Sequence, residues 1–166
     1  LNFLGPPYIE RNGQLLETDT RKAFALLAYC AVSGQPHTRD EIVTLLWPEL
    51  PERKGKAALR RTLSSIRRML TEDEIRITRD TITLLMEGKL WIDIQQFVEK
   101  SQSSQLDELE EAAALYRDDF LTGFTLRDSV IFDDWQYEQS EHFRRTLQQL
   151  LQRLMDWFMK QGAYEK

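Results

Sequence analysis

RKGKAALRRTLSSIRRML, residues Arg53–Leu70, is the stretch that decides how this chain folds. It holds seven basic residues and no acidic one, although the whole chain of 166 residues has a net charge of −5. Leu59, Leu63, Ile66 and Leu70 recur at helical spacing, which predicts a helix with one apolar stripe. The basic residues lie outside that stripe. A helix that packs by one face and presents a basic, acid-free face outward is typical of an element that enters the major groove of DNA.

The plain alternative for this stretch is a solvated surface helix. Such helices usually interleave Glu with Lys or Arg, because oppositely charged neighbours one turn apart stabilise each other. The absence of acidic residues from 53–70 therefore favours a nucleic-acid partner.

The segments around the basic helix predict an order of hairpin, three helices and hairpin. Asn12-Gly13 is a strong signal for the first hairpin, because both residues tolerate positive φ. Helices are predicted over 21–32 and 39–46, and Thr38 with Glu41 forms a capping box for the second of them. Alternating residues at 75–78 and 81–84 flank the turn Arg79-Asp80, and Leu90–Ile92 is a third extended piece available for pairing. This order predicts a winged helix-turn-helix, in which the third helix enters the major groove and the last hairpin is the wing.

The charge distribution divides the chain into two predicted domains. Residues 1–88 hold 13 basic and 12 acidic side chains, whereas residues 89–166 hold 9 and 15. From Asp93 onward the pattern is helical, with helices predicted near 94–100, 106–116 and 129–160 and with Asp93 as the cap of the first. We therefore expect an α+β winged helix-turn-helix domain over 1–88. An all-α, tetratricopeptide-like helical domain should follow over 89–166, truncated because the pattern stops in mid-repeat at Lys166.

Composition argues against several classes of protein. Cys30 is the only cysteine, so no disulfide forms within the chain and a cytoplasmic, reducing compartment is expected. No apolar run is long enough to span a membrane. His37 and His142 stand far apart without Cys or acidic partners at metal-ligand spacing, and the chain has no glycine-rich phosphate loop and no nucleophile elbow. We expect neither an enzyme nor a bound metal or cofactor. The aromatic set Trp135, Tyr137, Phe143, Trp157 and Phe158 could line a ligand groove, but its helical spacing favours core packing.

Several motifs in this order resemble those of one family of regulators. They are LGPP (4–7), RKAFALLAYCAVSG (21–34), TRDEIVTLLWPE (38–49), ALRRTLSSIRRML (58–70), WIDIQQF (91–97), EEAAALYRDDFLTGF (110–124) and FDDWQYEQ (132–139). The chain resembles the Streptomyces antibiotic regulatory protein (SARP) family along nearly its whole length. The resemblance implies an OmpR-type winged helix followed by a bacterial transcriptional activator domain. It also implies RNA polymerase as a protein partner, beside double-stranded promoter DNA.

Candidate DNA-binding residues fall into two groups. Those expected to read bases lie in the middle of the third helix, where Arg can bind guanine with two hydrogen bonds: Lys56, Arg60, Arg61 and Ser64. Those expected to contact phosphates are Trp47, Arg53, Lys54, Arg67, Arg68 and Arg79. Alternatives remain open for several of them. Arg61 could instead pair with an acid, Arg67 and Arg68 could interact with the helix dipole, and Trp47 could serve only the core, its phosphate contact being implied by the resemblance. Arg21 and Lys22 are equally compatible with phosphate contact and with a solvated surface.

The sequence therefore predicts a sequence-specific DNA-binding transcription regulator that activates from promoter repeats, with self-association on DNA as a further expectation. The alternative is a protein–protein adaptor whose winged helix no longer binds DNA. The basic helix argues against that alternative.

Overall fold

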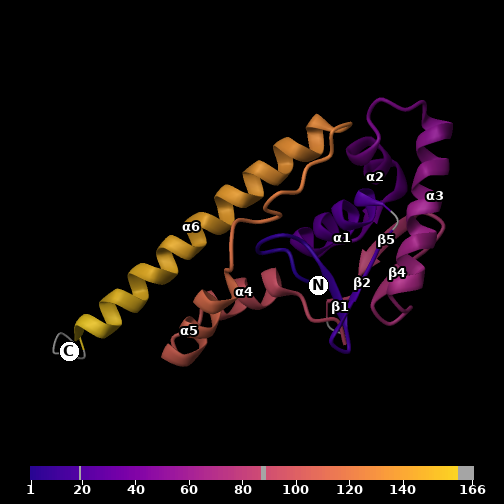
Figure 1. Ribbon diagram of the computed structural model, residues 1–166. Helices are drawn as coiled ribbons and strands as arrows, with labels where there is room; N and C mark the ends of the chain where they lie inside the picture. The colour runs from indigo at the N-terminus through magenta and orange to yellow at the C-terminus, as the bar shows by residue number, and fades with distance from the viewer. Residues whose placement is uncertain (19, 87–88, 161–166) are drawn as a thin grey trace.

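The computed structural model describes residues 1–18, 20–86 and 89–160, which form two small sheets and six helices (Figure 1). In chain order the elements are β1 (Ile9–Arg11), β2 (Gln14–Leu16), α1 (Arg21–Ser33), β3 (His37–Thr38), α2 (Arg39–Leu46), α3 (Glu52–Met69), β4 (Ile75–Ile77), β5 (Thr81–Leu84), α4 (Asp93–Ser101), α5 (Leu106–Leu115) and α6 (Val130–Lys160). The predicted order of hairpin, three helices and hairpin is confirmed.

Local sequence signals explain the boundaries of these elements. Asn12 and Gly13 both have positive φ, 54° and 77°, and connect β1 to β2 as an Asn-Gly hairpin requires. Gly34 ends α1 in the left-handed conformation, where its N–H bonds the Cys30 carbonyl. The Thr38 side chain accepts a hydrogen bond from the N–H of Glu41 and so caps α2, whose bounds match the prediction.

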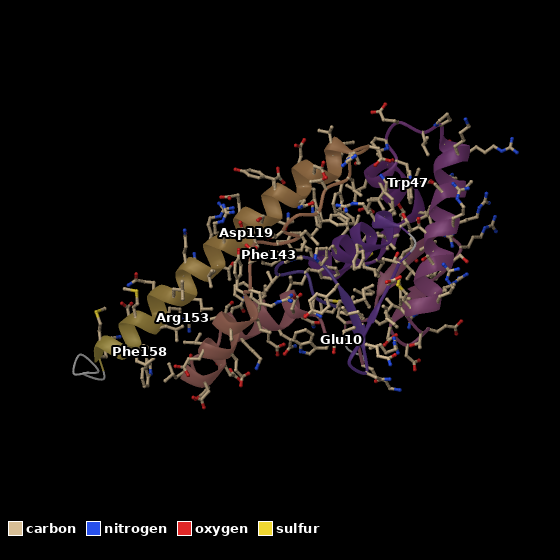
Figure 2. The ribbon with its side chains drawn as sticks, viewed as in Figure 1. Glu10, Trp47, Asp119, Phe143, Arg153 and Phe158 are labelled. Atoms are coloured by element: carbon tan, nitrogen blue, oxygen red, sulfur yellow. The ribbon has the colours of Figure 1, made fainter. Side chains whose placement is uncertain are left out.

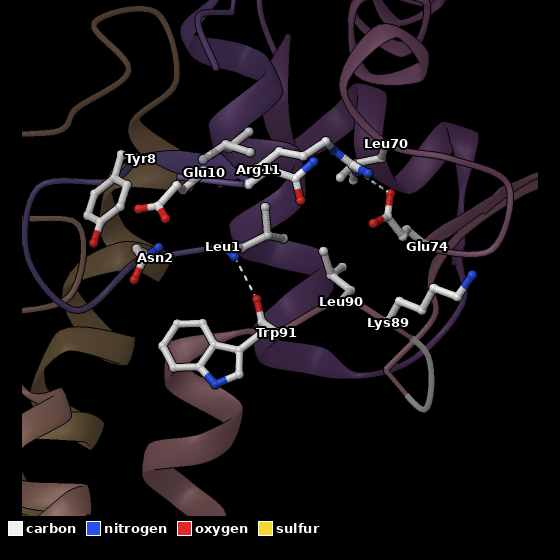
Figure 3. A pocket seen from close by; sticks show the side chains of 12 residues that line it. Leu1, Asn2, Tyr8, Glu10, Arg11, Leu70, Glu74, Lys89, Leu90 and Trp91 are labelled. Carbon is white, nitrogen blue, oxygen red and sulfur yellow. Dashed lines mark hydrogen bonds and ion pairs between the residues drawn. The ribbon is translucent and has the colours of Figure 1, made fainter. Parts of the chain in front are cut away.

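The third extended piece, Leu90–Ile92, does not join the sheet of the wing. The second sheet has the order β3-β5-β4, so the free side of β5 is taken by the two residues of β3. Leu90–Ile92 runs instead beside the first residue of the sequence. The amino group of Leu1 donates to the Trp91 carbonyl at 2.6 Å, and the N–H of Asp93 donates to the Leu1 carbonyl at 3.1 Å. These contacts lie at the edge of a hollow of about 500 Å³, where an ion pair joins Arg11 to Glu74 (Figure 3).

Asp93 is not the predicted helix cap, because the cap position of α4 is occupied by Ile92. Asp93 is the first residue of α4 and is only 1% exposed. One carboxylate oxygen accepts from the N–H of Ile94, but the other accepts from the N–H groups of Phe3 and Leu4 at 2.7 and 2.8 Å. Burial raises the pKa of this carboxyl, while the N–H donors and Arg117 stabilise its charged form. Asp93 therefore anchors the start of the chain to the helical part.

The described C-terminal part consists of α4, α5 and the long α6, which packs against α4 and α5 and extends past them (Figure 1). Phe143, Leu150 and Leu154 on α6 are buried. Further along α6, Leu151, Met155, Phe158 and Met159 form a row of exposed apolar side chains (Figure 2 labels Phe143 and Phe158). The prediction of aromatic core packing holds for Phe143 and largely for Trp135, but Tyr137 is 68% exposed and Phe158 is 40% exposed.

The apolar core runs without interruption from the winged-helix part into the helical part. Phe24 of α1 packs edge-on against Phe124, and Tyr29 packs against Trp135 of α6 at 5.0 Å between ring centroids. The predicted boundary at residue 88 lies outside the described residues, and the division into domains 1–88 and 89–166 stays a prediction. Within the described part of the chain, no helix is both long and apolar enough to cross a membrane.

Candidate nucleic-acid interface

Helix α3 is held by its apolar stripe. Leu59, Leu63 and Ile66 are nearly or completely buried, and they pack toward α1 and α2. Gly55 allows α3 to approach α2 closely, because a Cβ at that position would lie 2.6 Å from Cγ1 of Val43. Val43 is β-branched and has little rotamer freedom in a helix, so a larger residue at 55 would push the two helices apart. The close crossing leaves the opposite side of α3 open to solvent.

The open side of α3 carries most of the residues that the sequence singled out. The exposed members are Arg53, Lys54, Arg60, Arg61, Ser64, Arg67 and Arg68. Figure 2 shows nitrogen-bearing side chains projecting outward along this helix. Arg68 also donates to the Ser65 hydroxyl at 3.4 Å. We call this side of α3, together with Arg79, the basic face. One acidic residue, Glu52, belongs to the first turn of α3, as suits the positive end of the helix dipole.

Lys56 is placed differently from the other predicted base readers. Its ammonium group lies 2.6 Å from a Glu52 carboxylate oxygen and 3.0 Å from one of Asp40. The hydrogen bonds from these two carboxylates raise the pKa of Lys56. A base or phosphate that binds Lys56 must therefore compete with two local acids.

The wing is short and is fixed to the start of α2. The Thr78 and Thr81 side chains and backbones bond each other across the turn that presents Arg79. The Arg39 guanidinium donates to the Thr78 carbonyl at 2.7 and 3.2 Å, and the Arg39 N–H donates to the Asp80 carbonyl. Arg39 is not among the residues predicted to bind DNA. The sequence did offer one indication of a partner for Arg39. The residue is a cation in the first turn of a helix, where the helix dipole disfavours positive charge.

Helix α3 and the wing tip meet at a hollow of about 260 Å³. It is lined by Arg60 and Leu59 of α3, by Arg79 and Asp80 of the wing, and by Arg39, Asp40 and Lys56. Arg60 and Arg79 thus lie at one small concavity although they are far apart in sequence. Several cationic groups around a concavity of this size can hold an anion such as a phosphate oxygen.

Trp47 lies in the core at the end of α2 and is 8% exposed (Figure 2). Lys22, which the sequence left as a phosphate contact or a solvated residue, is also 8% exposed, with its ammonium group 5.5 Å from the centre of the Trp47 ring. That ammonium group bonds the Leu46 carbonyl and lies 2.7 Å from Asp128. Neither alternative for Lys22 is right, since it caps the end of α2. The phosphate contact assigned to Trp47 stays a prediction.

Residues of the helical part thus reach the loop that leads into α3. The hydroxyl of Ser129, itself buried, donates to the Leu45 carbonyl at 2.6 Å, beside the Lys22–Asp128 pair. The final carbonyls of a helix have no partner within the helix, and here side chains supply it. Sequence patterns missed Ser129, because its partner is 84 residues away.

Within the described ranges, no group of three or more His, Cys, Asp and Glu side chains is placed to hold a metal ion. Ser33, His37 and Glu41 do form a hydrogen-bonded chain, with 2.5 Å from the Ser33 hydroxyl to Nε2 and 2.7 Å from Nδ1 to Glu41. The Ser33 hydroxyl also donates to the Cys30 carbonyl, so the chain fastens the end of α1 to the start of α2.

Comparison with known proteins gives one informative likeness. No family model and no curated protein sequence matches the chain. Among solved structures, its fold is similar to that of EmbR from Mycobacterium tuberculosis, determined in complex with a low-affinity phosphopeptide. The TM-score is 0.66 and the sequence identity 19%, over 87% of this chain and 42% of EmbR. The chain therefore spans about two fifths of that protein, and the likeness shows a shared fold.

Proposed function

We propose that this protein is a sequence-specific, DNA-binding transcription regulator of the SARP type. The observation that carries the proposal is the basic face. Six cations of α3 are exposed on one side of the helix, and Arg79 of the wing joins Arg60 at the adjoining hollow. A protein with a net charge of −5 approaches DNA favourably only through such a local concentration of positive charge.

We assign different types of DNA contact to different residues of the basic face. Arg61 and Ser64, exposed in the middle of α3, are suited to reading base edges in the major groove. Arg60 reads a base or holds a phosphate from its place beside Arg79. Lys56 contributes only when it leaves Asp40 and Glu52. Phosphate contacts along the flanks are assigned to Arg53, Lys54, Arg67, Arg68 and Arg79, and the family resemblance adds Trp47, which is largely buried.

The shared fold with EmbR, a SARP-family regulator, supports the regulatory role and fits a protein that is not an enzyme. We assign α4–α6 to the beginning of a tetratricopeptide-like activator domain that contacts RNA polymerase and promotes self-association on DNA. We further assign the protein to the cytoplasm. The alternative function, a protein–protein adaptor without DNA binding, would require the basic face to have another anionic partner.

A fluorescence-anisotropy titration with random duplex DNA at several salt concentrations tests the proposal. Binding should weaken steeply with added salt, because cations that contact phosphates release counterions from DNA. The double variant Arg61→Gln/Arg67→Gln should reduce affinity and the salt slope. Arg127→Gln, which removes one charge from an exposed position outside the basic face, is the control and should change little. Absent or salt-independent binding would favour the adaptor.

A further inference from the structure

We propose that a hollow between the end of α1, helix α4 and the middle of α6 binds a small neutral or cationic amphiphile, a molecule with an apolar body and a hydrogen-bonding head. Its volume is about 430 Å³, within the range of sites for small organic ligands. None of its lining residues belongs to the basic face. The proposal therefore does not depend on whether the basic face binds DNA.

The floor of the hollow is apolar. Ile94 and Val98 lie one turn apart on α4 and so line the same side of that helix. Ala31 at the end of α1 and Phe143 of α6 complete the floor, and both are at least 95% buried. Met86, which follows β5, closes one side and is half-buried. An apolar molecule seated here would cover the remaining exposed surface of Val98 and Met86 and would remove its own surface from water.

The rim carries polar side chains that make no hydrogen bond to the rest of the described protein. These are the amides of Gln95 and Gln139, both half-buried, and the imidazole of His142. Gln136, one turn before Gln139, shows the contrasting behaviour, since it donates to the carbonyls of Leu121 and Phe124. Half-buried amides without a protein partner bind water or a ligand. Gln95, Gln139 and His142 therefore offer donors and acceptors around an apolar floor.

The charges that line the hollow determine which ligand head groups it can accept. Among the described residues that line the hollow, Glu99 is the one carboxylate, and none is Lys or Arg. An anionic head would meet Glu99 without a compensating cation, whereas an amide, hydroxyl or amine would be accepted. The structure therefore favours neutral and cationic ligands over anionic ones.

The test uses N-phenyl-1-naphthylamine, a neutral apolar dye that becomes fluorescent in apolar surroundings, titrated into the whole chain. Saturable binding is expected, and Val98→Gln and Gln139→Ala should each weaken it about tenfold, since one removes apolar contact and the other a polar partner. Met155→Gln makes the same type of change on the exposed apolar row of α6 and should leave binding unchanged. The anionic dye 8-anilinonaphthalene-1-sulfonate should bind more weakly than the neutral one.

Amide shift mapping of the unmodified protein with the neutral dye provides a readout that does not depend on the stability of a variant. The perturbed amides should cluster at 31–34, 94–99 and 139–143. Shifts elsewhere, a larger effect of Met155→Gln than of Val98→Gln, tighter binding of the anionic dye, or no saturable binding would each overturn the proposal.

Discussion

The guanidinium of Arg39 donates two hydrogen bonds to the carbonyl of Thr78, at 2.7 and 3.2 Å, and so fixes the wing turn against the first residue of α2. This contact sets the position of Arg79 relative to Arg60 across the hollow that they share. The wing has no long loop of its own, so its placement depends on this attachment.

Replacing Arg39 by alanine should therefore weaken DNA binding by about tenfold at moderate salt, with similar losses for all sequences, because a positioning contact and a nearby cation are removed together. Arg39→Lys should recover the charge but not the paired hydrogen bonds. Anisotropy titrations of both variants against specific and random duplexes measure the effect. An undiminished affinity for Arg39→Ala would show that the wing tip does not contact DNA.

Arg61 and Arg79 should differ in the type of loss that they cause. Arg61→Ala should cost about 1–3 kcal/mol at one base step and relax the choice of base there, because a bidentate contact to guanine carries sequence information. Arg79→Ala should weaken all sequences alike, because a phosphate contact carries none. Selection of bound sequences from random DNA with each variant separates the two. Sequence-blind losses from both would refute the assignment of Arg61 to base reading.

The carboxylates around Lys56 should restrain non-specific binding. Glu52→Gln removes an acid 2.6 Å from the ammonium group, leaves Asp40 as the remaining carboxylate beside the lysine and lowers repulsion of DNA phosphates. We expect affinity for random duplex to rise by about three- to tenfold at low salt, and the gain to shrink as salt is added. Glu49→Gln, an exposed acid in the preceding loop that makes no ion pair with Lys56, is the matched control. An equal gain from both variants would show a general charge effect instead of release of Lys56.

Sequence patterns predicted those parts of the molecule that depend on near neighbours. The Asn12-Gly13 turn, the bounds of α2 and the buried stripe of α3 follow from turn chemistry, capping and periodicity, all of which act within a few residues. The errors concern groups with distant partners. By sequence, Lys22 has the features of a surface lysine, but in the fold it pairs with Asp128 at the end of α2. Asp93 has the features of a helix cap, but in the fold it accepts hydrogen bonds from the N–H groups of Phe3 and Leu4. The hollow between Arg60 and Arg79 likewise exists only once α3 and the wing are packed together.

Asp119 should make the helical part sensitive to acid. Its carboxylate lies 2.5 Å from a guanidinium nitrogen of Arg144, and this hydrogen bond, followed by that from Tyr116, holds the pKa of Asp119 below its usual value. Because the pKa is lower in the folded than in the unfolded chain, the stabilisation is present above the unfolded value of about 3.9 and is lost as the pH falls through the folded value.

Asp119→Asn should therefore flatten the fall in unfolding free energy between about pH 4 and pH 2. Urea titrations at several pH values measure this slope. Asp134→Asn, at an exposed position near the start of α6, serves as the control and should retain the slope of the unmodified protein. A slope that Asp119→Asn leaves unchanged would indicate that the pair with Arg144 is too exposed to affect stability.

The winged-helix and helical parts should unfold together, because Asp93 links them from within the core. Asp93→Ala leaves the N–H groups of Phe3 and Leu4 without their acceptor and should lower the free energy of unfolding by about 3 kcal/mol. Asp93→Asn keeps an acceptor oxygen and removes a buried charge, so its loss should be clearly smaller.

Asp107→Ala, at an exposed site in the first turn of α5, should cost less than about 1 kcal/mol, the usual value of a charge near a helix terminus. Urea unfolding followed by circular dichroism and by tryptophan fluorescence should give coincident transitions for the unmodified chain, since Trp47 and Trp135 lie in different parts of one continuous core. Two separate transitions, or equal losses from Asp93→Ala and Asp107→Ala, would show that the parts are energetically independent. In that case the contacts of Lys22 and Ser129 with the end of α2 would not couple the stability of the helical part to that of the basic face.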